Sequence, residues 1–439
     1  MPAVAGAWTS IDSAIKTAYP SKSLEAMVNQ ETPLRQWMST TLPANATWTK
    51  GGKLTFGAWL DTANNVGQML DNTALPPTTE RTETTLVLHP TAFASSFGIG
   101  EISRSAGISD QAAWNGGEIV RRTEEATSDL GKFMEQTFWL DSTGIRAYVE
   151  SDTTNAFVCK LPQGVQFLYP NQLISVRTAA GAGVRDSMDL IRITLKNPDT
   201  RLITYDASSA TFGRNADATV VADDPVYVTT HLTQTFTAAV AQGIRGIVDD
   251  GTYLATYLAA TRATYAPKLY GQVFANGGVR RNLTESLLIK SIHQARGRSG
   301  KTPTDGWWGP GQIEKYCEFV APDRRAVVTG KTALPNRATG YQEGDLVHYA
   351  PGATINFHMS YDVCPAEMFI LAPDTFFRYV AREPAWLDKG NLLKLMPATT
   401  GYGFLAGYVA YLTAVENIAS DNPYANVAIR DLKDSAYGD

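Results

Sequence analysis

Two segments with strand character, separated by a polar stretch, constrain the fold of this chain more than any other feature. Apolar and β-branched residues alternate in residues 47–60 and again in residues 80–100. Residues 61–79 between them are rich in asparagine, glycine and proline, which favour turns. The pattern predicts a long two-stranded β-hairpin over residues 41–100. An isolated hairpin is marginally stable in water, so this finger must lie on another surface, in this chain or in a neighbouring copy.

The segments around the finger have helical patterns. Residues 1–40 are interrupted by Pro20 and Pro33 and read as an N-terminal arm with short helical turns around residues 23–30. After the finger, Ser109 or Asp110 can cap a helix that runs to about Leu140. The inward face expected for that helix consists of Ile119, Ala126, Leu130, Phe133, Met134 and Thr137. It is one of the longest helices that the sequence predicts.

The middle of the chain changes to short β-like runs. In residues 163–230 these runs alternate with turn residues, which predicts a small all-β subdomain; the runs are 165–168, 173–177, 190–195, 202–205 and 226–228. Residues 236–265 read as irregular helix. A capping-box arrangement at residues 282–285 opens a helix that is expected to stop near Gly297. A second helix begins around Pro310.

Strand patterns return at residues 354–357, 368–371, 404–415 and 427–432. The class is therefore α+β, with the divisions 1–40, 41–100, 101–162, 163–230, 231–400 and 401–439. No repeat of 20 to 50 residues, the sign of a solenoid, is visible.

Composition narrows the function. The 439 residues contain 38 Lys and Arg against 43 Asp and Glu, a net charge of −5. A dedicated duplex-DNA binder usually has a clearly basic domain, so that class is disfavoured. Charged residues make up 18% of the chain, below the roughly 25% of typical soluble domains, which suggests that much of the surface is covered by a partner. We expect a soluble protein, because no secretory signal is visible and the most apolar run, 401–415, is too short to span a bilayer.

Patterns that could support catalysis are weak. The two Gly-Lys-Thr triplets, at Gly300 and Gly330, lack the first glycine of a phosphate-binding loop and are followed by proline. The glycines at 401–407 fit a strand better than a dinucleotide site. The five histidines and three cysteines are scattered, without metal-ligand spacing. We therefore predict no catalytic, cofactor-binding or metal-ligating residues, no cofactor, and no enzymatic activity.

Aromatic and basic residues instead suggest contacts between chains. The sequence has nine tryptophans, and several of them fall in the arm and finger, which have little core to bury them. Tryptophan and arginine are the residues that most often anchor interfaces. The candidate inter-subunit contacts are Trp37, Trp48, Lys50, Lys53, Trp59, Arg121 and Arg122.

The order of these parts resembles the major capsid proteins of tailed bacteriophages, which have the Hong Kong 97-type fold. Residues 45–100 are similar to that family's extension loop, and residues 109–141 to its spine helix. Residues 282–303 and 309–325 look like the helices of its axial domain. Residues 368–377, 414–417 and 421–423 resemble short sequence segments near the C-terminal end of family members. The resemblance implies an arm (1–40), an extension loop (41–100), a peripheral domain with the spine helix (101–162), a β-rich insertion (163–230), an axial domain (231–400) and C-terminal strands that return to the body (401–439).

The resemblance also implies a function. The chain would assemble with itself into hexamers and pentamers, forming an icosahedral head shell around double-stranded DNA that it does not bind sequence-specifically. Expected partners are a portal protein, a separate scaffolding protein and a decoration protein, with no membrane. The protein would be made in the cytoplasm of a host bacterium and end in the virion. The slightly acidic balance fits an inner wall along which DNA can slide.

Two other classes remain open at this point. An encapsulin-like compartment, or another phage structural protein, would use a related shell and enclose a cargo protein or serve another role in the particle. An enzyme whose site is assembled from distant residues is the third alternative, and a purified monomer with turnover would favour it.

Overall fold

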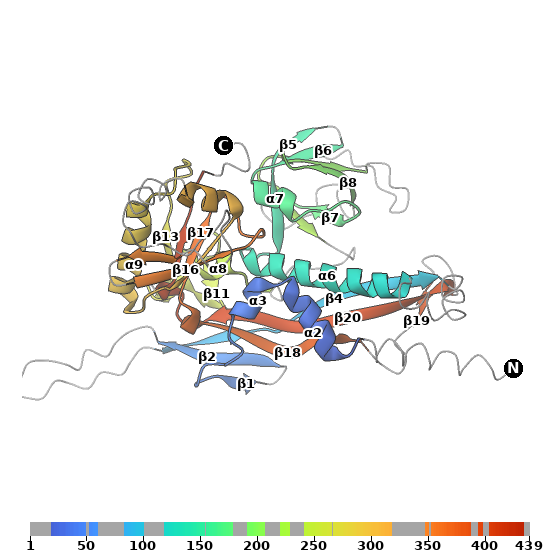
Figure 1. Ribbon diagram of the computed structural model, residues 1–439, viewed down its shortest axis with the longest axis horizontal. Helices are drawn as coiled ribbons and strands as arrows, with labels where there is room; N and C mark the ends of the chain where they lie inside the picture. Colours follow the sequence, from blue (N-terminus) through green and yellow to red (C-terminus); the bar gives the residue numbers. More distant parts are fainter. Residues whose placement is uncertain are drawn as a thin grey trace, which may run out of the picture.

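The computed structural model describes residues 19–49, 52–59, 83–100, 118–153, 155–178, 191–206, 220–228, 241–265, 267–317, 347–350, 353–387, 394–397 and 404–433. Four bodies can be followed in Figure 1: an elongated sheet with a long helix along it, a small sheet at the base of the finger, a closed barrel, and a six-stranded sheet flanked by helices. This mixture is the α+β class that the sequence predicts.

The elongated sheet is built around one long strand. β20 (Phe404–Ser420) pairs along one edge with β4 (Thr91–Gly100) and along the other with β18 (Phe376–Trp386) and β19 (Lys394–Pro397). The prediction assigned β18 and β19 to the axial domain 231–400, and this is wrong, because both strands pair with β20. Strand pairing over long sequence distances decided this assignment, and a single sequence does not reveal such pairing.

The predicted spine helix is α6 (Glu118–Trp139), which lies lengthwise over this sheet (Figure 1). Ala126, Leu130 and Met134 are buried, as its periodicity predicted. Phe133 was expected to face inward but is 36% exposed, and the guanidinium carbon of Arg146 lies 4.3 Å from the centre of its ring. The cap expected at residues 109–110 lies outside the described residues.

The described part of the arm is folded onto its own chain. It forms α2 (Ser21–Gln30) and α3 (Pro33–Trp37), and α2 packs against α6 and β18. Leu24 and Val28 are fully buried in that contact, so the chain itself provides the surface that covers this amphipathic segment.

The base of the finger is a three-stranded antiparallel sheet in the order β1-β2-β3, formed by β1 (Thr47–Thr49), β2 (Lys53–Trp59) and β3 (Glu83–Leu88). The single strand predicted for residues 80–100 is wrong: it breaks at His89 and Pro90, and β4 continues into the elongated sheet. Proline has no N–H to donate and restricts the preceding residue. Residues 60–82, which hold the rest of the predicted finger, lie outside the described part.

The finger base does have a core partner within the chain. Leu54, Phe56, Leu86 and Leu88 are all buried. The ring of Phe56 meets that of Phe377 on β18 edge to face, with centroids 5.1 Å apart. Burial of this apolar face explains why a small sheet is stable here although it would be marginal alone.

The β-rich segment forms a closed barrel in the order β10-β5-β6-β9-β8-β7. Its strands are β5 (Ile145–Thr153), β6 (Ala156–Cys159), β7 (Leu173–Val176), β8 (Ile191–Asn197), β9 (Leu202–Tyr205) and β10 (Pro225–Val228). The barrel therefore begins before the predicted start at residue 163. Positive φ angles at Ser142 (67°) and Gly144 (78°) turn the chain out of α6 and into β5.

One predicted strand of the barrel is helical. Residues 165–168 were expected to be extended, but α7 (Pro162–Gln166) includes the first two of them. Pro162 stands at the first position of α7, where its fixed φ and missing N–H are tolerated. The apolar residues of this segment, Val165, Phe167 and Leu168, are buried all the same.

The axial part is a mixed sheet in the order β13-β21-β17-β14-β16-β15. Its strands are β13 (Gln272–Phe274), β14 (Asp305–Trp308), β15 (Val347–Ala350), β16 (Ala353–Met359), β17 (Met368–Leu371) and β21 (Val427–Ile429). One face packs on α9 (Glu285–Ser299) through Leu288, Ile292, Trp308 and Phe357. The other face, with Trp307 and Phe369, belongs to the core that includes Trp139 at the end of α6.

The remaining axial elements are short. Residues 241–265, predicted as irregular helix, contain only α8 (Ile244–Ile247), the hairpin strands β11 (Thr256–Tyr257) and β12 (Ala260–Thr261), and the 3₁₀ turn η1 (Arg262–Tyr265). Two more 3₁₀ turns, η2 (Pro373–Thr375) and η3 (Pro423–Ala425), precede β18 and β21. The helix predicted at Pro310 begins there and is helical through residue 317, where the description stops.

Helix α9 begins and ends at residues other than those predicted. The hydroxyl oxygen of Thr284 accepts the backbone N–H of Leu287 at 3.3 Å and caps the helix. The helix passes through Gly297 and ends at Gly300, whose φ of 75° is left-handed. The first Gly-Lys-Thr triplet is therefore a helix terminator, as expected for a turn. The second triplet lies outside the described residues.

Candidate assembly surface and buried polar clusters

Trp37, the first predicted contact residue, is largely enclosed by its own chain. Its ring lies 5.8 Å from the rings of Trp307 and Phe376, and its Nε1 donates a hydrogen bond of 3.2 Å to Asp305. These partners join the arm to the first residues of β14 and β18. The side chain is half-buried, and its role between subunits remains a prediction.

Trp48 has a different environment. It lies in β1, the outer strand of the finger base, and is 61% exposed. Its described ring contact is with Tyr379 on β18, at 5.0 Å. Lys53 opens β2 and is half-buried. Trp59 ends β2, but its side chain is outside the description, as is all of Lys50.

The two arginines are on α6, near its start. Arg121 is 66% exposed at its side chain and lies 3.5 Å from Glu125, one helical turn away. Arg122 is half-buried. Trp139, at the other end of α6, is about 27 Å from Arg121 at 1.5 Å per residue. Trp37 and Trp48 both contact strand β18, whereas Arg121 and Arg122 lie apart from them, near the start of α6.

A buried cluster that the sequence did not predict fastens the arm to the elongated sheet; we call it the arm cluster. Its members are Arg35, Arg378, Glu383 and Glu416. Arg35 Nε lies 2.9 Å from Glu416 Oε1, and Arg378 Nη1 lies 3.2 Å from Glu416 Oε2. Glu383, which is 38% exposed, pairs with both arginines. The cluster fixes α3 to β18 and β20 through Arg35, Arg378 and Glu416, whose charges are fully or nearly desolvated, with the partly exposed Glu383 at its rim.

Glu135 on α6 forms a second link to the arm. Its Oε1 accepts the backbone N–H of Leu34 at 3.2 Å and the indole N–H of Trp139 at 2.9 Å. The side chain is fully buried, and this burial raises the pKa of Glu135 to about 8 despite the two hydrogen bonds. The carboxyl group is therefore mostly protonated at neutral pH.

The third link is Asp305 on β14, which receives the indole of Trp37. Its Oδ1 is also 2.8 Å from Nε2 of His358, and its Oδ2 accepts from the hydroxyl of Thr304 at 2.7 Å. Burial alone would raise the pKa of Asp305, but these hydrogen bonds outweigh it and the pKa lies below its usual value. An ionised Asp305 thus holds Trp37 against the axial sheet.

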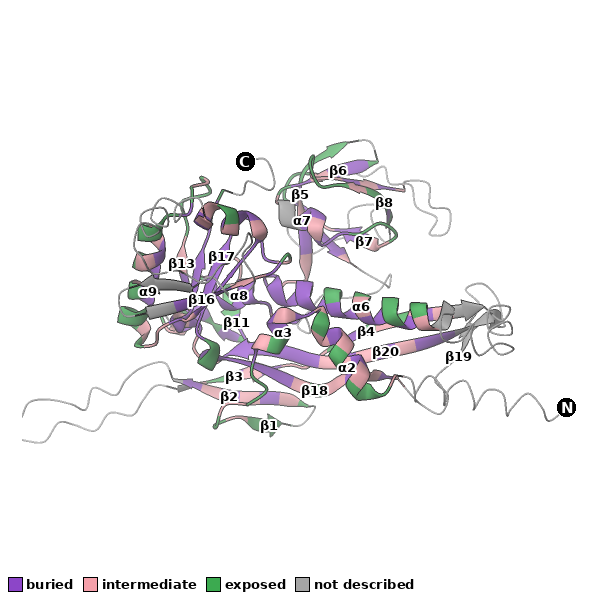
Figure 2. Ribbon diagram, in the orientation of Figure 1, coloured by how far each residue is buried: buried purple, intermediate pink, exposed green. Residues whose placement is uncertain are grey.

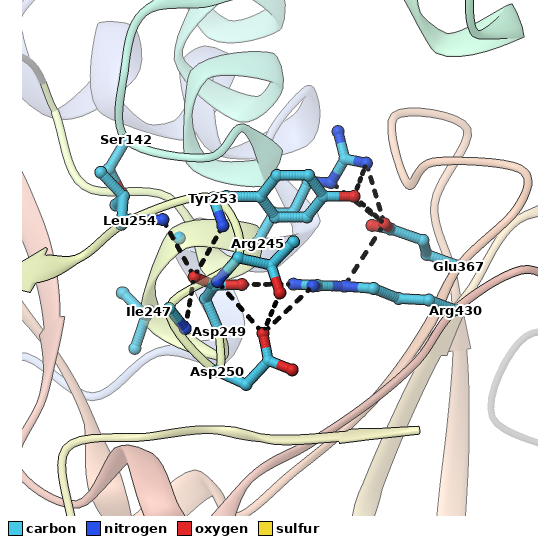
Figure 3. Close-up of polar contacts among 12 residues, drawn as sticks. Ser142, Arg245, Ile247, Asp249, Asp250, Tyr253, Leu254, Glu367 and Arg430 are labelled. Atoms are coloured by element: carbon cyan, nitrogen blue, oxygen red, sulfur yellow. Dashed lines mark hydrogen bonds and ion pairs between the residues drawn. The ribbon is translucent and has the colours of Figure 1, made fainter. Parts of the chain in front are cut away.

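A buried network organises the axial part; we call it the axial cluster, and Figure 3 shows it. Arg245 of α8 lies 2.9 Å from Glu367, and Arg430, just after β21, lies 3.0 Å from Asp249. Both guanidinium groups cover the ring of Tyr253, at 4.3 and 4.2 Å from its centre. The second oxygen of Asp249 accepts three backbone N–H groups from residues 251–254. The cluster joins the α8 loop to the end of β21 and the start of β17, which are neighbours in the axial sheet.

A cavity lies between the finger base and the axial part. Its volume is about 380 Å³, and it is lined by Pro43, Ala44, Asn45, Gly57, Lys301, Asp421 and Asn422. Asn45 is used locally, since its side-chain amide donates to the carbonyl of Gly57 at 2.8 Å. Lys301 lies 2.8 Å from Asp374. The lining combines amides with one ammonium and one carboxylate, without a nucleophile next to a base.

Among the residues that the structure describes, no three histidine, cysteine, aspartate or glutamate side chains are grouped so as to hold a metal ion. No helix in the described ranges has the length and apolar character to cross a membrane.

Comparisons of the whole chain with known proteins identify the fold. No model of a known protein family matches the sequence, and no curated protein matches it. The structure is similar to the capsid asymmetric unit of cyanophage A-1(L), with a TM-score of 0.50 and 11% identity over 91% of this chain and 93% of that one. More remote likenesses are to a virus-like particle from Pyrococcus furiosus (TM-score 0.34, 9% identity, 93% and 96% covered) and to the capsid of Myoviridae phage XM1 (0.39, 8%, 90% and 90%).

The chain therefore has the fold of tailed-phage capsid proteins, which is the Hong Kong 97-type fold predicted from the order of its parts. At this level of identity the comparison identifies the architecture.

Proposed function

We propose that this protein is the major capsid protein of a tailed bacteriophage. In this proposal it assembles with itself into hexamers and pentamers that form an icosahedral head shell around double-stranded DNA, and its role is structural rather than enzymatic. The single observation that carries the proposal is the likeness to the cyanophage A-1(L) capsid subunit, which extends over 91% of the chain. A likeness of that extent spans most of the chain rather than one of its parts.

The geometry supports assembly in a second way. The arm cluster, Glu135 and the axial cluster tie segments that are distant in the sequence together within one chain. In the proposed shell, the exposed finger base with Trp48 meets a different patch on the next copy. Such heterologous contacts close into rings when the rotation permits. Repetition of modest contacts around each subunit then yields a stable shell.

The proposed partners follow from this role. They are other copies of the chain, a portal protein, a separate scaffolding protein and a decoration protein on the outside. The protein would be made in the cytoplasm of the host bacterium and would reside in the virion. The enclosed DNA would be held without sequence-specific binding.

A compartment of the encapsulin type, which encloses a cargo protein, is the alternative within the same fold. The likeness to the virus-like particle is more remote than that to the cyanophage capsid subunit, with TM-scores of 0.34 and 0.50. The contents of purified particles distinguish the two functions, because a phage head encloses DNA and a compartment encloses protein.

Electron microscopy of the purified full-length chain, with size-exclusion chromatography, tests the proposal. We expect closed shells or five- and six-membered rings. A homogeneous monomer that never assembles, even when phage proteins are co-expressed, would contradict a shell function. Particles filled with a cargo protein would favour the compartment instead.

A further inference from the structure

The solvent-exposed face of α9 carries an unusual concentration of positive charge. Residues 286–304 contain four Lys or Arg residues and no Asp or Glu, in a chain where acidic residues outnumber basic ones by 43 to 38. Lys290, His293, Arg296 and Arg298 are all exposed. Lys301 follows the C-cap and lies 2.8 Å from Asp374. We call Lys290, His293, Arg296 and Arg298 the basic face.

Packing of the opposite side orients this face. Leu288, Ser291, Ile292 and Ala295 are buried against the axial sheet, so the residues between them must point to solvent. Figure 2 shows α9 on the side of the axial part away from α6 and the barrel, with exposed residues along it. Capping by Thr284 and Gly300 holds the whole helix in register. The cations are therefore presented on a rigid support.

The charge extends onto a neighbouring element. η3 packs against α9, and the ammonium of Lys268 lies 5.5 Å from the ring of Tyr424 in η3. The side-chain amide of Gln272 donates to the carbonyl oxygens of both Tyr424, at 2.8 Å, and Ala295, at 3.5 Å. This buried bridge holds η3, and with it the ring that Lys268 contacts, against α9.

Stabilisation of the helix does not account for all of this charge. Cations in the last turn, here Arg296 and Arg298, interact favourably with the negative end of the helix dipole. That effect falls off within one turn, so it does not reach Lys290, in the middle of the helix, or Lys268, outside it. The helix dipole therefore leaves Lys290 and Lys268 unexplained, and it does not prevent the exposed Arg296 and Arg298 from binding an anion as well.

We propose that the basic face of α9 binds the phosphate backbone of nucleic acid without reading its sequence. This rests on the proposed shell function only for the biological setting, in which the ligand is the enclosed DNA. The proposal also revises the expectation, drawn from the net charge, that the inner wall of the shell does not bind DNA. Net charge does not reveal which face carries the positive residues.

The spacing favours a continuous polyanion over an acidic protein surface. Lys290 and Arg298 are eight residues apart, about 12 Å along a helix. One strand of duplex DNA presents a phosphate every ~3.4 Å of its axis, so several phosphates fall within that reach. An acidic protein segment would need a carboxylate opposite each cation in a matching register. Arginine also binds phosphate through two parallel hydrogen bonds.

The test measures how the affinity of the free full-length chain for a short fluorescent duplex depends on salt between about 50 and 200 mM. We expect the affinity to fall as salt rises. Because each neutralised phosphate contributes about 0.9 to the slope of log affinity against log salt, the variant Arg296→Gln/Arg298→Gln should lower the magnitude of that slope by about 1.8. The matched control is Lys160→Gln/Arg201→Gln, which removes the same charge from the barrel and should leave the slope unchanged.

The proposal is overturned if the slope of log affinity against log salt is unchanged in the α9 variant. It is also overturned if the control variant lowers that slope by the same amount. Competition by polyglutamate as effective as that by DNA also overturns it and identifies an acidic protein surface as the occupant. If circular dichroism shows that the double variant is unfolded, Lys290→Gln replaces it, with an expected loss of about 0.9 in slope. Shell assembly is scored separately by microscopy, so shells that form with an unchanged slope reject the basic face while leaving the shell function intact.

Discussion

Arg35 of α3 and Glu416 of β20, separated by 381 residues, form an ion pair of 2.9 Å in which both side chains are fully buried. Arg378 shares the same carboxylate at 3.2 Å. A buried carboxylate between two guanidinium groups is stable only while both remain, because removal of one leaves charge that water cannot reach. The pair therefore makes docking of the arm part of the fold of the subunit.

The variant Arg35→Met should destabilise the chain strongly. It leaves Glu416 with one buried partner in place of two, and we expect a loss of about 3 kcal/mol in the free energy of unfolding. Denaturant titration measures it. The control Lys160→Met breaks a pair with Asp223 whose side chains are 53% and 59% exposed, and should cost less than about 1 kcal/mol. Similar losses in both variants would mean that the arm cluster contributes no more than a surface pair.

Stability should depend on pH through Glu135. Folding raises the pKa of this carboxyl from 4.5 to about 8 because it is buried. Between these values the folded chain keeps the proton that the unfolded chain releases, so the contribution of Glu135 to stability is full below pH 4.5 and is lost as pH rises toward 8. The steepest loss from one such group is about 1.4 kcal/mol per pH unit.

The variant Glu135→Gln isolates this contribution, because glutamine keeps an acceptor for Leu34 and Trp139 but does not ionise. Unfolding midpoints between pH 5 and 8 should fall less steeply in the variant than in the wild type. Glu125→Gln, at an exposed position on the same helix, serves as the control and should keep the wild-type slope. If the unfolding midpoints of the wild type and of Glu135→Gln fall equally steeply with pH, Glu135 does not contribute to the pH dependence of stability.

Two glycines should respond to the same substitution in opposite directions. A Cβ at Gly243 would lie 2.1 Å from the carbonyl oxygen of Leu140, where the chain returns beside the end of α6. Gly243→Ala should therefore cost about 3 kcal/mol of stability, since backbone must move. Gly297 in α9 has no atom within 4 Å of an added Cβ, and Gly297→Ala should stabilise by about 0.5–1 kcal/mol through helix propensity. Thermal unfolding of the two variants measures both effects. If Gly297→Ala also destabilises the chain, Gly297 does not lie on the open side of α9.

Trp37 and Trp48, the tryptophans of the arm and finger base whose side chains are described, should have different roles: Trp37 in the stability of the subunit and Trp48 in assembly of the shell. Trp37→Ala removes a ring that contacts Trp307 and Phe376, and should lower subunit stability by about 3 kcal/mol. Trp48, 61% exposed, should affect the unfolding midpoint little when changed to alanine. Its loss should instead reduce the yield of shells, measured by sedimentation and microscopy. If Trp48→Ala forms shells in the same yield as the wild type, Trp48 does not contribute to the contact between subunits.

Local patterns in the sequence predicted much of the architecture correctly. The periodicity of α6, the alternation in β2 and β20, and the presence of helix α9 each depend on neighbouring residues, whose spacing is visible in one chain. The errors lie where a distant partner decided the outcome. His89 and Pro90 end β3 because β4 finds its partner in β20, and β5 joins the barrel because β10 closes on it.

The sequence by itself determined which segments are helical or extended, which faces are apolar, and the order of parts that identifies the capsid fold. Only the tertiary structure decided which segments meet. It brought Arg35 to Glu416, Arg245 to Glu367, and the finger base to β18. The physical reason is that periodicity is a local property of the chain, whereas desolvated charge pairs and strand pairing depend on positions hundreds of residues apart, and a net charge of −5 cannot reveal that one exposed helix face is positive.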